Sequence, residues 1–150
     1  MKYILIITML ISVLFQPTAS ADSSKYVEFL NTKPANERLP FSEAVRVGDT
    51  VYLSGQIGID PKTGKLAKGG FKAEARQTLT NIKATLTKYG YGTEDVVKCL
   101  VMLTDINDFS AFNDIYTDFF KPPYPARSAF ATSELALGSL VEVECIAVAG

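Results

Sequence analysis

The 150-residue sequence contains no histidine. Without histidine the chain lacks the usual general base at neutral pH, the commonest metal ligand, and any Ser-His or Cys-His nucleophilic pair. An excess of positive charge is also missing, since 15 basic residues face 16 acidic ones. This balance gives no electrostatic footprint for nucleic acid or for an anionic membrane surface. We therefore expect neither a metal site nor a nucleic-acid partner.

Cysteine is scarce, with only Cys99 and Cys145, and no CxxC motif occurs. Two cysteines are too few for a disulfide framework. Each lies in a run rich in Val, Ile and Leu, so we expect buried free thiols. A bridge between them is the alternative, which requires the two runs to be adjacent strands.

Long apolar runs are confined to the start of the chain. Lys2 precedes an almost uncharged segment over 4–15, and Ala19-Ser20-Ala21 follows it. A basic start, an apolar core and an Ala-x-Ala site are typical of a secretory signal peptide, with cleavage expected after Ala21. The apolar run is short for a membrane span, although an uncleaved anchor is the alternative. We expect a secreted or periplasmic protein without a membrane segment after cleavage.

The remaining chain is predicted to form an N-terminal arm over 22–39 and one compact domain over 40–150. Alternating and apolar patterns predict strands, and apolar residues three and four apart predict helices. The strands are expected at 43–47, 50–54, 96–103, 124–131 and 141–148, and the helices at 72–89 and 108–119. This ββαβαββ order indicates an α+β fold, a mixed sheet with both helices on one face. The other face then needs burial, for which oligomerisation is the simple solution.

Aromatic residues recur at helical spacing in the second predicted helix. They are Phe109, Phe112, Tyr116 and Phe119. Such a stripe is more often part of a hydrophobic core than of a ligand site, and we interpret it as core.

Arg127 lies in the apolar strand-like segment over 124–131. A guanidinium is costly to desolvate unless it is paired, and its planar fork binds carboxylates through two parallel hydrogen bonds. Glu142 and Glu144 lie in the next predicted strand. The residues alone leave two interpretations open: a structural Arg–Glu pair across strands, or an arginine that holds an anionic ligand while one glutamate does chemistry.

Several segments together resemble the RidA/YjgF family, over about 40–149. They are Ala44-Val45-Arg46-Val47-Gly48, Leu53-Ser54-Gly55-Gln56-Ile57, Asp60-Pro61-Lys62-Thr63-Gly64, Arg76-Gln77 with Asn81-Ile82-Lys83-Ala84, Asp95-Val96-Val97-Lys98, Asp108-Phe109 through Tyr116, Pro125-Ala126-Arg127-Ser128, and Val141-Glu142-Val143-Glu144 with Ile146-Ala147-Val148. No single segment is decisive, but their joint order and spacing make a chance match improbable.

The resemblance implies a chorismate-mutase-like homotrimer with clefts between subunits. It implies hydrolysis of enamines and imines, such as 2-aminoacrylate, to 2-oxo acids and ammonia without metal or cofactor. In this family pattern Arg127 matches the residue that grips the substrate carboxylate, and Glu142 the one that positions or activates water. Ser54, Gly55 and Asn113 match positions at the cleft.

Two residues depart from the family pattern. Phe41 stands where many members have a tyrosine, which removes a hydroxyl and could alter substrate preference or rate. Ala129 stands where many have a cysteine, a position thought to contribute its backbone. Of the two glutamates, only Glu142 is expected to face the cleft of the arginine, with Glu144 on the opposite face of the strand.

Three functions remain open at this point. The first is an imine and enamine deaminase acting on small 2-imino acids. The second is a non-catalytic trimer that binds small carboxylates or acts as a holdase. The third, an endoribonuclease or translation inhibitor, is disfavoured by the missing histidine, the slightly acidic charge balance and the export signal.

Overall fold

The computed structural model describes residues 26–34 and 39–150. The predicted signal peptide and its cleavage site lie outside these residues. Within the described part of the chain, no helix is long and apolar enough to cross a membrane.

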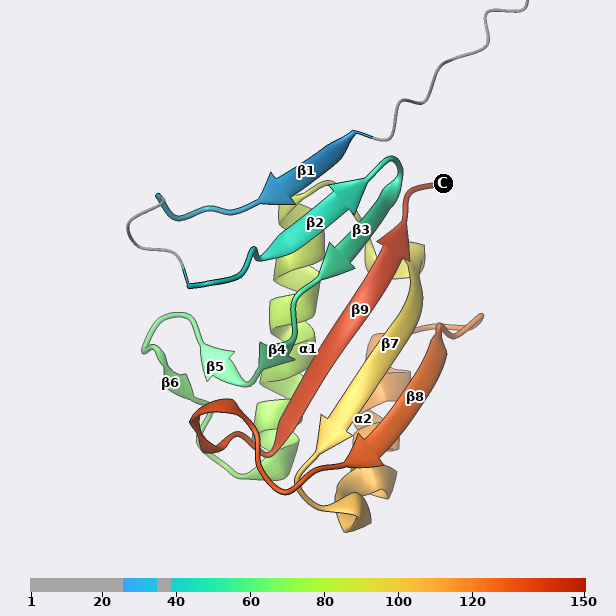
Figure 1. Ribbon diagram of the computed structural model, residues 1–150. Coiled ribbons are helices and arrows are strands. Elements are labelled where there is room, and N and C mark those ends of the chain that lie inside the picture. The colour runs from blue at the N-terminus through green and yellow to red at the C-terminus, as the bar shows by residue number, and fades with distance from the viewer. Residues whose placement is uncertain (1–25, 35–38) are drawn as a thin grey trace, which may run out of the picture.

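A mixed sheet forms the front layer of the molecule in Figure 1, and both α-helices lie behind it. The strands run in the order β1-β2-β3-β9-β7-β8, with the short β4 also paired to β9. Their bounds are β1 Val27–Leu30, β2 Ala44–Val47, β3 Thr50–Leu53, β4 Gln56–Ile57, β7 Val96–Leu103, β8 Ala126–Ala131 and β9 Val141–Val148. All neighbours pair antiparallel except β7 and β8, which are parallel.

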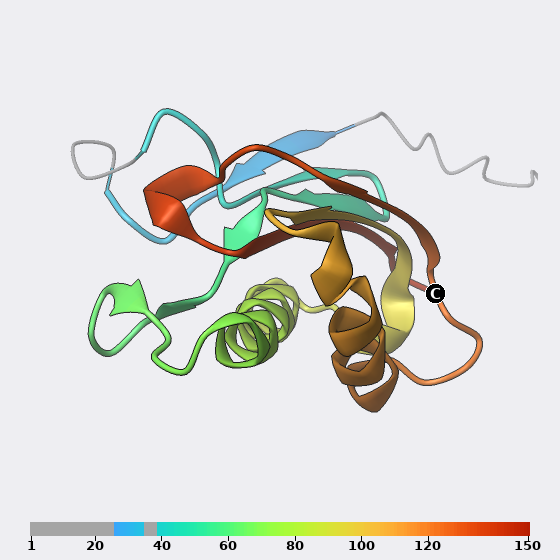
Figure 2. The same ribbon diagram turned by 90° about the horizontal axis from the view of Figure 1, so that it is seen from below.

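The two helices are α1, Phe71–Lys88, and α2, Phe109–Phe119. Figure 2 shows them side by side beneath the same face of the sheet. A small separate sheet pairs β5, Ile59–Asp60, with β6, Lys65–Leu66. Three 3₁₀ turns complete the described elements: η2 Thr93–Asp95, η3 Ile106–Asp108 and η4 Ala136–Gly138.

The α+β fold with two helices on one sheet face confirms the prediction from sequence. Sequence patterns did not predict β1, β4, β5 or β6. Strand β1 lies in the segment assigned to an arm, yet its four residues pair with β2 and extend the sheet. The described part of that arm is therefore built into the domain.

Alternation along β9 separates the two faces of the sheet. Val141, Val143, Cys145 and Ala147 are at most 1% exposed and face the helices. Helix α1 covers them with one apolar stripe, whose members include Leu79, Ile82 and Leu86. Burial of this stripe, rather than helix propensity, supplies most of the stability of such a helix.

The opposite face of the sheet, which we call the open face, has no covering layer within the described chain (Figure 2). The register places Phe29, Val45, Tyr52 and Ile146 side by side across it, on β1, β2, β3 and β9. Phe29 is 71% exposed and Tyr52 47% exposed. An apolar surface of this kind is typical of a protein interaction site.

Cys99 and Cys145 form a disulfide, so the expectation of free thiols is wrong. They are direct partners in the antiparallel register of β7 and β9, with their Cα atoms 4.1 Å apart. The sequence could not give this result, because β9 is the last strand in the chain but lies in the centre of the sheet. The bridge ties two buried central strands together.

Reduction of this bridge is expected to destabilise the fold. The disulfide spans 46 positions of the chain, and closing a loop of this order restricts the unfolded state by about 2–4 kcal/mol. Protein unfolded and refolded with excess reductant should lose about 10 °C in Tm. The Cys99→Ala/Cys145→Ala variant is the control, since its Tm should not respond to reductant. Two titratable thiols in the unreduced, unfolded wild type would contradict the assignment.

Candidate active site

Arg127 projects from β8 toward the helices. It pairs in register with Cys99 of β7, which is fully buried on the helix-covered face. Its Nη2 donates a hydrogen bond of 2.6 Å to Oδ1 of Asn113 on α2. Since β8 is the last strand of the sheet path, the arginine lies at the sheet edge, half-buried and within reach of solvent.

Three aromatic rings of α2 surround the same guanidinium. Its central carbon lies 4.6 Å from the ring centroid of Tyr116, 5.4 Å from that of Phe109 and 5.9 Å from that of Phe112. All three are within cation–π distance. Among the described residues no carboxylate forms an ion pair with Arg127. The positive charge is thus held by an amide and rings that leave it unneutralised.

Ala129 lies two positions after Arg127 on β8 and shares its face of the sheet. Its methyl group packs partly buried against the hydrophobic core. Ala129 thus borders the arginine through the backbone of the same strand, and its side chain brings no reactive group to it.

Glu142 lies on the open face, because it pairs with Met102 while Val141 and Val143 on either side are buried. A Cβ added to Gly55 would overlap the Glu142 carboxylate, so any larger residue at position 55 would displace this side chain from its present place. Burial raises the pKa of Glu142, and the negative charge of Glu144 raises it further. A raised pKa brings a carboxylate nearer to the range useful for proton transfer at neutral pH.

The expectation that Glu142 and Glu144 face opposite ways is wrong. They are two positions apart in β9, and side chains two apart share a face of a strand. Glu144 is exposed and acts on its neighbour as a like charge.

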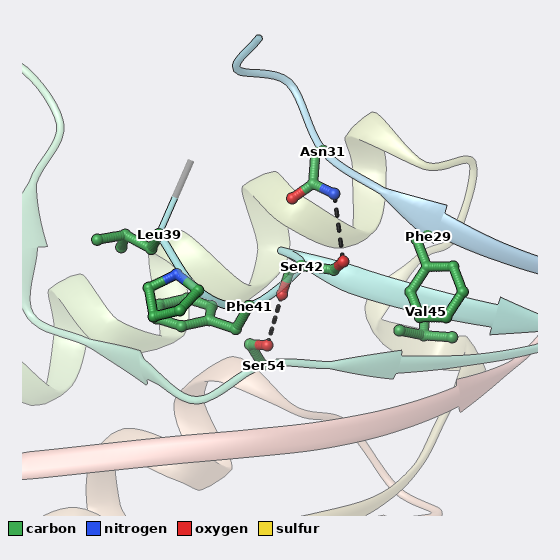
Figure 3. Close-up of a pocket in the computed structure, with 8 residues that line it drawn as sticks. Phe29, Asn31, Leu39, Phe41, Ser42, Val45 and Ser54 are labelled. Atoms are coloured by element: carbon green, nitrogen blue, oxygen red, sulfur yellow. Dashed lines mark hydrogen bonds between the residues drawn. The ribbon is translucent and has the colours of Figure 1, made fainter. Parts of the chain in front are cut away.

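Ser54 and Phe41 line an open cavity of about 560 Å³ beside β2 and β3. The close-up in Figure 3 shows them together with Phe29, Val45 and Leu39. The Ser54 hydroxyl donates a 2.6 Å hydrogen bond to the carbonyl of Ser42, which joins the segment before β2 to the end of β3. The cavity walls are mostly apolar and belong to the open face.

Within one chain the candidate residues form two separate groups. Arg127, Asn113 and Ala129 lie at the β8 edge under the helix-covered face. Glu142, Gly55, Ser54 and Phe41 gather on the open face, around β3, β4 and β9. The register that places Arg127 beside Cys99 and Glu142 beside Met102 puts the two groups on opposite sides of the sheet. A direct Arg127–Glu142 pair across strands therefore does not form.

Sequence reasoning gave no role to Glu43, which fixes the chain next to the cavity. Its carboxylate accepts hydrogen bonds from Lys88, Tyr89 and Thr32. Burial raises the pKa of Glu43, but these hydrogen bonds outweigh it and lower the pKa to about 2. Glu43 thus anchors the segment leading into β2 to the end of α1. No local sequence pattern indicates this cluster, because its members are up to 57 positions apart in the chain, from Thr32 to Tyr89.

No group of three or more potential metal ligands occurs among the described residues. The side chains at the two groups of candidate residues supply a guanidinium, an amide, a hydroxyl and a carboxylate of raised pKa. Such a set can hold an anionic group and transfer a proton to or from water.

These elements define an α+β protein of the chorismate-mutase-like class, with a helix-supported arginine on one sheet face and a glutamate on the other. A family model described as "Endoribonuclease L-PSP" matches residues 32–149. The chain belongs to this family, the RidA/YjgF family.

Similar curated proteins carry a deaminase name. The "2-iminobutanoate/2-iminopropanoate deaminase" of Capra hircus is 50% identical over 111 residues, which are 74% of this chain and 81% of the goat protein. The human protein of the same name is 46% identical with the same coverage. Among solved structures, RidA of the Antarctic bacterium Psychrobacter sp. has a TM-score of 0.72 at 41% identity, covering 81% of this chain and 94% of that one. E. coli TdcF with bound serine has the same TM-score and coverage at 32% identity.

The protonation of Glu142 gives a test of the site geometry. Its pKa in the folded protein is raised from 4.5, so the folded state holds this proton to higher pH than the unfolded chain does. Protonated Glu142 favours folding at low pH, and this contribution is lost as pH rises through the folded pKa. Glu142→Gln should therefore raise Tm relative to wild type at about pH 7 and not at about pH 3.5.

A second experiment tests whether Glu142 and Glu144 share a face of β9. Carboxyl NMR of Glu144→Gln should show a lower pKa for Glu142 than in wild type, because the like charge is removed. An unchanged Glu142 pKa would contradict the placement of the two glutamates on one face.

Proposed function

We propose that the protein is a hydrolytic deaminase that converts small 2-imino acids to 2-oxo acids and ammonia. The observation that carries the proposal is Arg127, whose guanidinium is held by Asn113 and Tyr116 and has no carboxylate partner within residues 26–34 and 39–150. Its fork is suited to the carboxylate of a small acid. The deaminase name of relatives up to 50% identical supports the reaction class. The serine bound to the TdcF neighbour, an amino acid with such a carboxylate, supports the ligand class.

In the proposed reaction Arg127 binds the carboxylate and orients the adjacent C=N group. Ionised Glu142 accepts a proton from water as the water oxygen bonds to the carbon of the N-protonated imine. The resulting neutral carbinolamine carries both a hydroxyl and an amine on that carbon. Glu142 returns the proton to the amine, the C–N bond breaks and ammonia leaves, while the hydroxyl proton passes to Glu142 as the carbonyl forms. The imine carbon is already electrophilic, so orientation and one acid–base group supply the acceleration.

We propose further that each site is assembled from two subunits of a homotrimer. The two groups of candidate residues lie on opposite faces of one sheet, so one chain cannot bring Arg127 and Glu142 to the same ligand. The apolar open face, with Phe29 and Tyr52 exposed, is suited to burial against another copy. A neighbouring subunit that covers this face could present its β8 edge to Glu142.

We also propose that the mature protein acts outside the cytoplasm, after cleavage following Ala21. The disulfide between Cys99 and Cys145 supports this compartment, because disulfides persist in oxidising environments. Imines formed there by oxidation of amino acids are the substrates expected to reach the protein.

The direct test couples the mature protein to an amino-acid oxidase that generates imines in situ, and follows release of 2-oxo acid. Wild type should accelerate release, and Arg127→Ala should lower kcat/KM by at least about 100-fold, because orientation of the carboxylate is lost. Arg76→Ala is the matched control, since its ion pair with Asp118 is largely exposed. Equal rates for wild type and Arg127→Ala would contradict the proposal. A protein that has no deaminase activity but still binds 2-oxo acids would indicate the non-catalytic alternative. RNA cleavage that persists in Arg127→Ala would indicate the endoribonuclease alternative.

Sites shared between subunits give a second test. Arg127→Ala and Glu142→Gln should each be inactive alone. Trimers refolded from an equal mixture of the two variants should recover about one quarter of wild-type activity. A site is intact only when one subunit supplies native Arg127 and its neighbour supplies native Glu142, and each condition holds in about half of the cases. Activity that stays absent in verified mixed trimers would place both residues in one chain's site.

A further inference from the structure

We propose that three rings of the aromatic stripe of α2, those of Phe109, Phe112 and Tyr116, position Arg127, and that the ring of Tyr116 is the main contact. The inference rests on the proposed function in one respect, that Arg127 binds the ligand carboxylate. These aromatic residues have the spacing of an ordinary core helix, and the proposal gives them a second role, that of positioning Arg127. The ring fixes where the guanidinium sits, and so acts on the ligand through Arg127.

The contacts surround the guanidinium from one helix. Phe109, Phe112, Asn113 and Tyr116 are spaced three and four residues apart, so they share one face of α2. The amide of Asn113 accepts a hydrogen bond from one guanidinium nitrogen, while the rings lie within 5.9 Å of the central carbon. An amide and ring faces restrain the fork without neutralising its charge.

Tyr116 is the best placed of the three rings. It is 4% exposed, and its centroid is the nearest to the guanidinium. Its ring also packs at a tilt against that of Phe120, with the centroids 4.6 Å apart, so its own orientation is fixed. Its hydroxyl is buried and has no hydrogen-bond partner among the described residues. Burial raises the pKa of this phenol, against the opposing charge of Arg127. The hydroxyl therefore has no visible structural task, and the face of the ring makes the contact with the arginine.

Pre-positioning has a direct consequence for binding. A free arginine side chain loses rotamer freedom when a ligand immobilises it, and that loss weakens binding. A guanidinium already held by rings and an amide has lost this freedom before the ligand arrives. The carboxylate then meets a fork of fixed orientation, which favours the bidentate geometry.

The test measures the affinity for 2-oxobutanoate as a carboxylate probe by calorimetry on the full mature protein. Tyr116→Leu removes the ring and should raise Kd by about tenfold. Tyr116→Phe keeps the ring and should restore affinity to within about twofold of wild type. Phe119→Leu is the matched control, because Phe119 lies on the same helix and packs on Phe120, and its ring is not one of those that contact Arg127 among the described residues.

Two further readouts separate positioning from general stability. In the deaminase assay Tyr116→Leu should raise KM with kcat changed by less than about threefold, because the ring acts on ligand binding rather than on proton transfer. The Nε–H resonance of Arg127, shifted by ring currents in wild type and in Tyr116→Phe, should move toward the position of a free arginine in Tyr116→Leu.

Unchanged affinity in a folded, trimeric Tyr116→Leu would overturn the inference, as would an equal loss in Phe119→Leu. Where Tyr116→Leu fails to assemble, Phe109→Leu replaces it, since Phe109 is 37% exposed; a rise in Kd of about threefold is then expected, and an unchanged Kd contradicts the inference. Arg127→Ala separates the two proposals. If it binds the probe as wild type does, the proposed function fails; if it loses binding while Tyr116→Leu keeps it, only the positioning role fails.

Discussion

The pairing of β9 with β7 is the constraint on which the rest of the structure depends. This one register makes the core face of the sheet, joins Cys99 to Cys145 and points Glu142 away from the helices. A shift by one residue would exchange the two faces of β9 and bury its glutamates. The disulfide crosses the same pair of strands, so it resists the slip that would be most damaging to the site.

The same register explains why the candidate residues are divided. Strand β8 continues the sheet beyond β7 in parallel, and Arg127 takes the face of its partner Cys99. Helix α2 connects β7 to β8 and covers that face, which is the short right-handed crossover expected between parallel neighbours. The connection that makes β8 parallel therefore also brings the aromatic stripe to the arginine. Glu142 belongs to the same sheet but lies on its open face, away from α2.

Most of the regular elements could be predicted from the sequence, because apolar periodicity reports burial directly. The hairpin of β2 and β3, both helices and the long strands β7 and β9 lie within two residues of expectation. Strand adjacency carries no local signal, so neither the disulfide nor the separation of Arg127 from Glu142 could be predicted. The aromatic stripe shows what a spacing pattern leaves out. Phe112 and Tyr116 are buried in the core, as predicted, but they also contact Arg127, which was not predicted. A spacing pattern identifies the buried face of a helix but not what is buried against it.

The choice of partners around Arg127 decides what the arginine can do. A carboxylate neighbour would stabilise the half-buried charge most strongly, but it would occupy the fork and cancel the field that attracts an anion. Ring faces and one amide stabilise less, and they leave both the charge and an edge of the fork for a ligand. The arrangement therefore exchanges some stability for binding capacity. An arginine whose only purpose was to hold the sheet edge to α2 would be better served by an acidic residue at the position of Asn113.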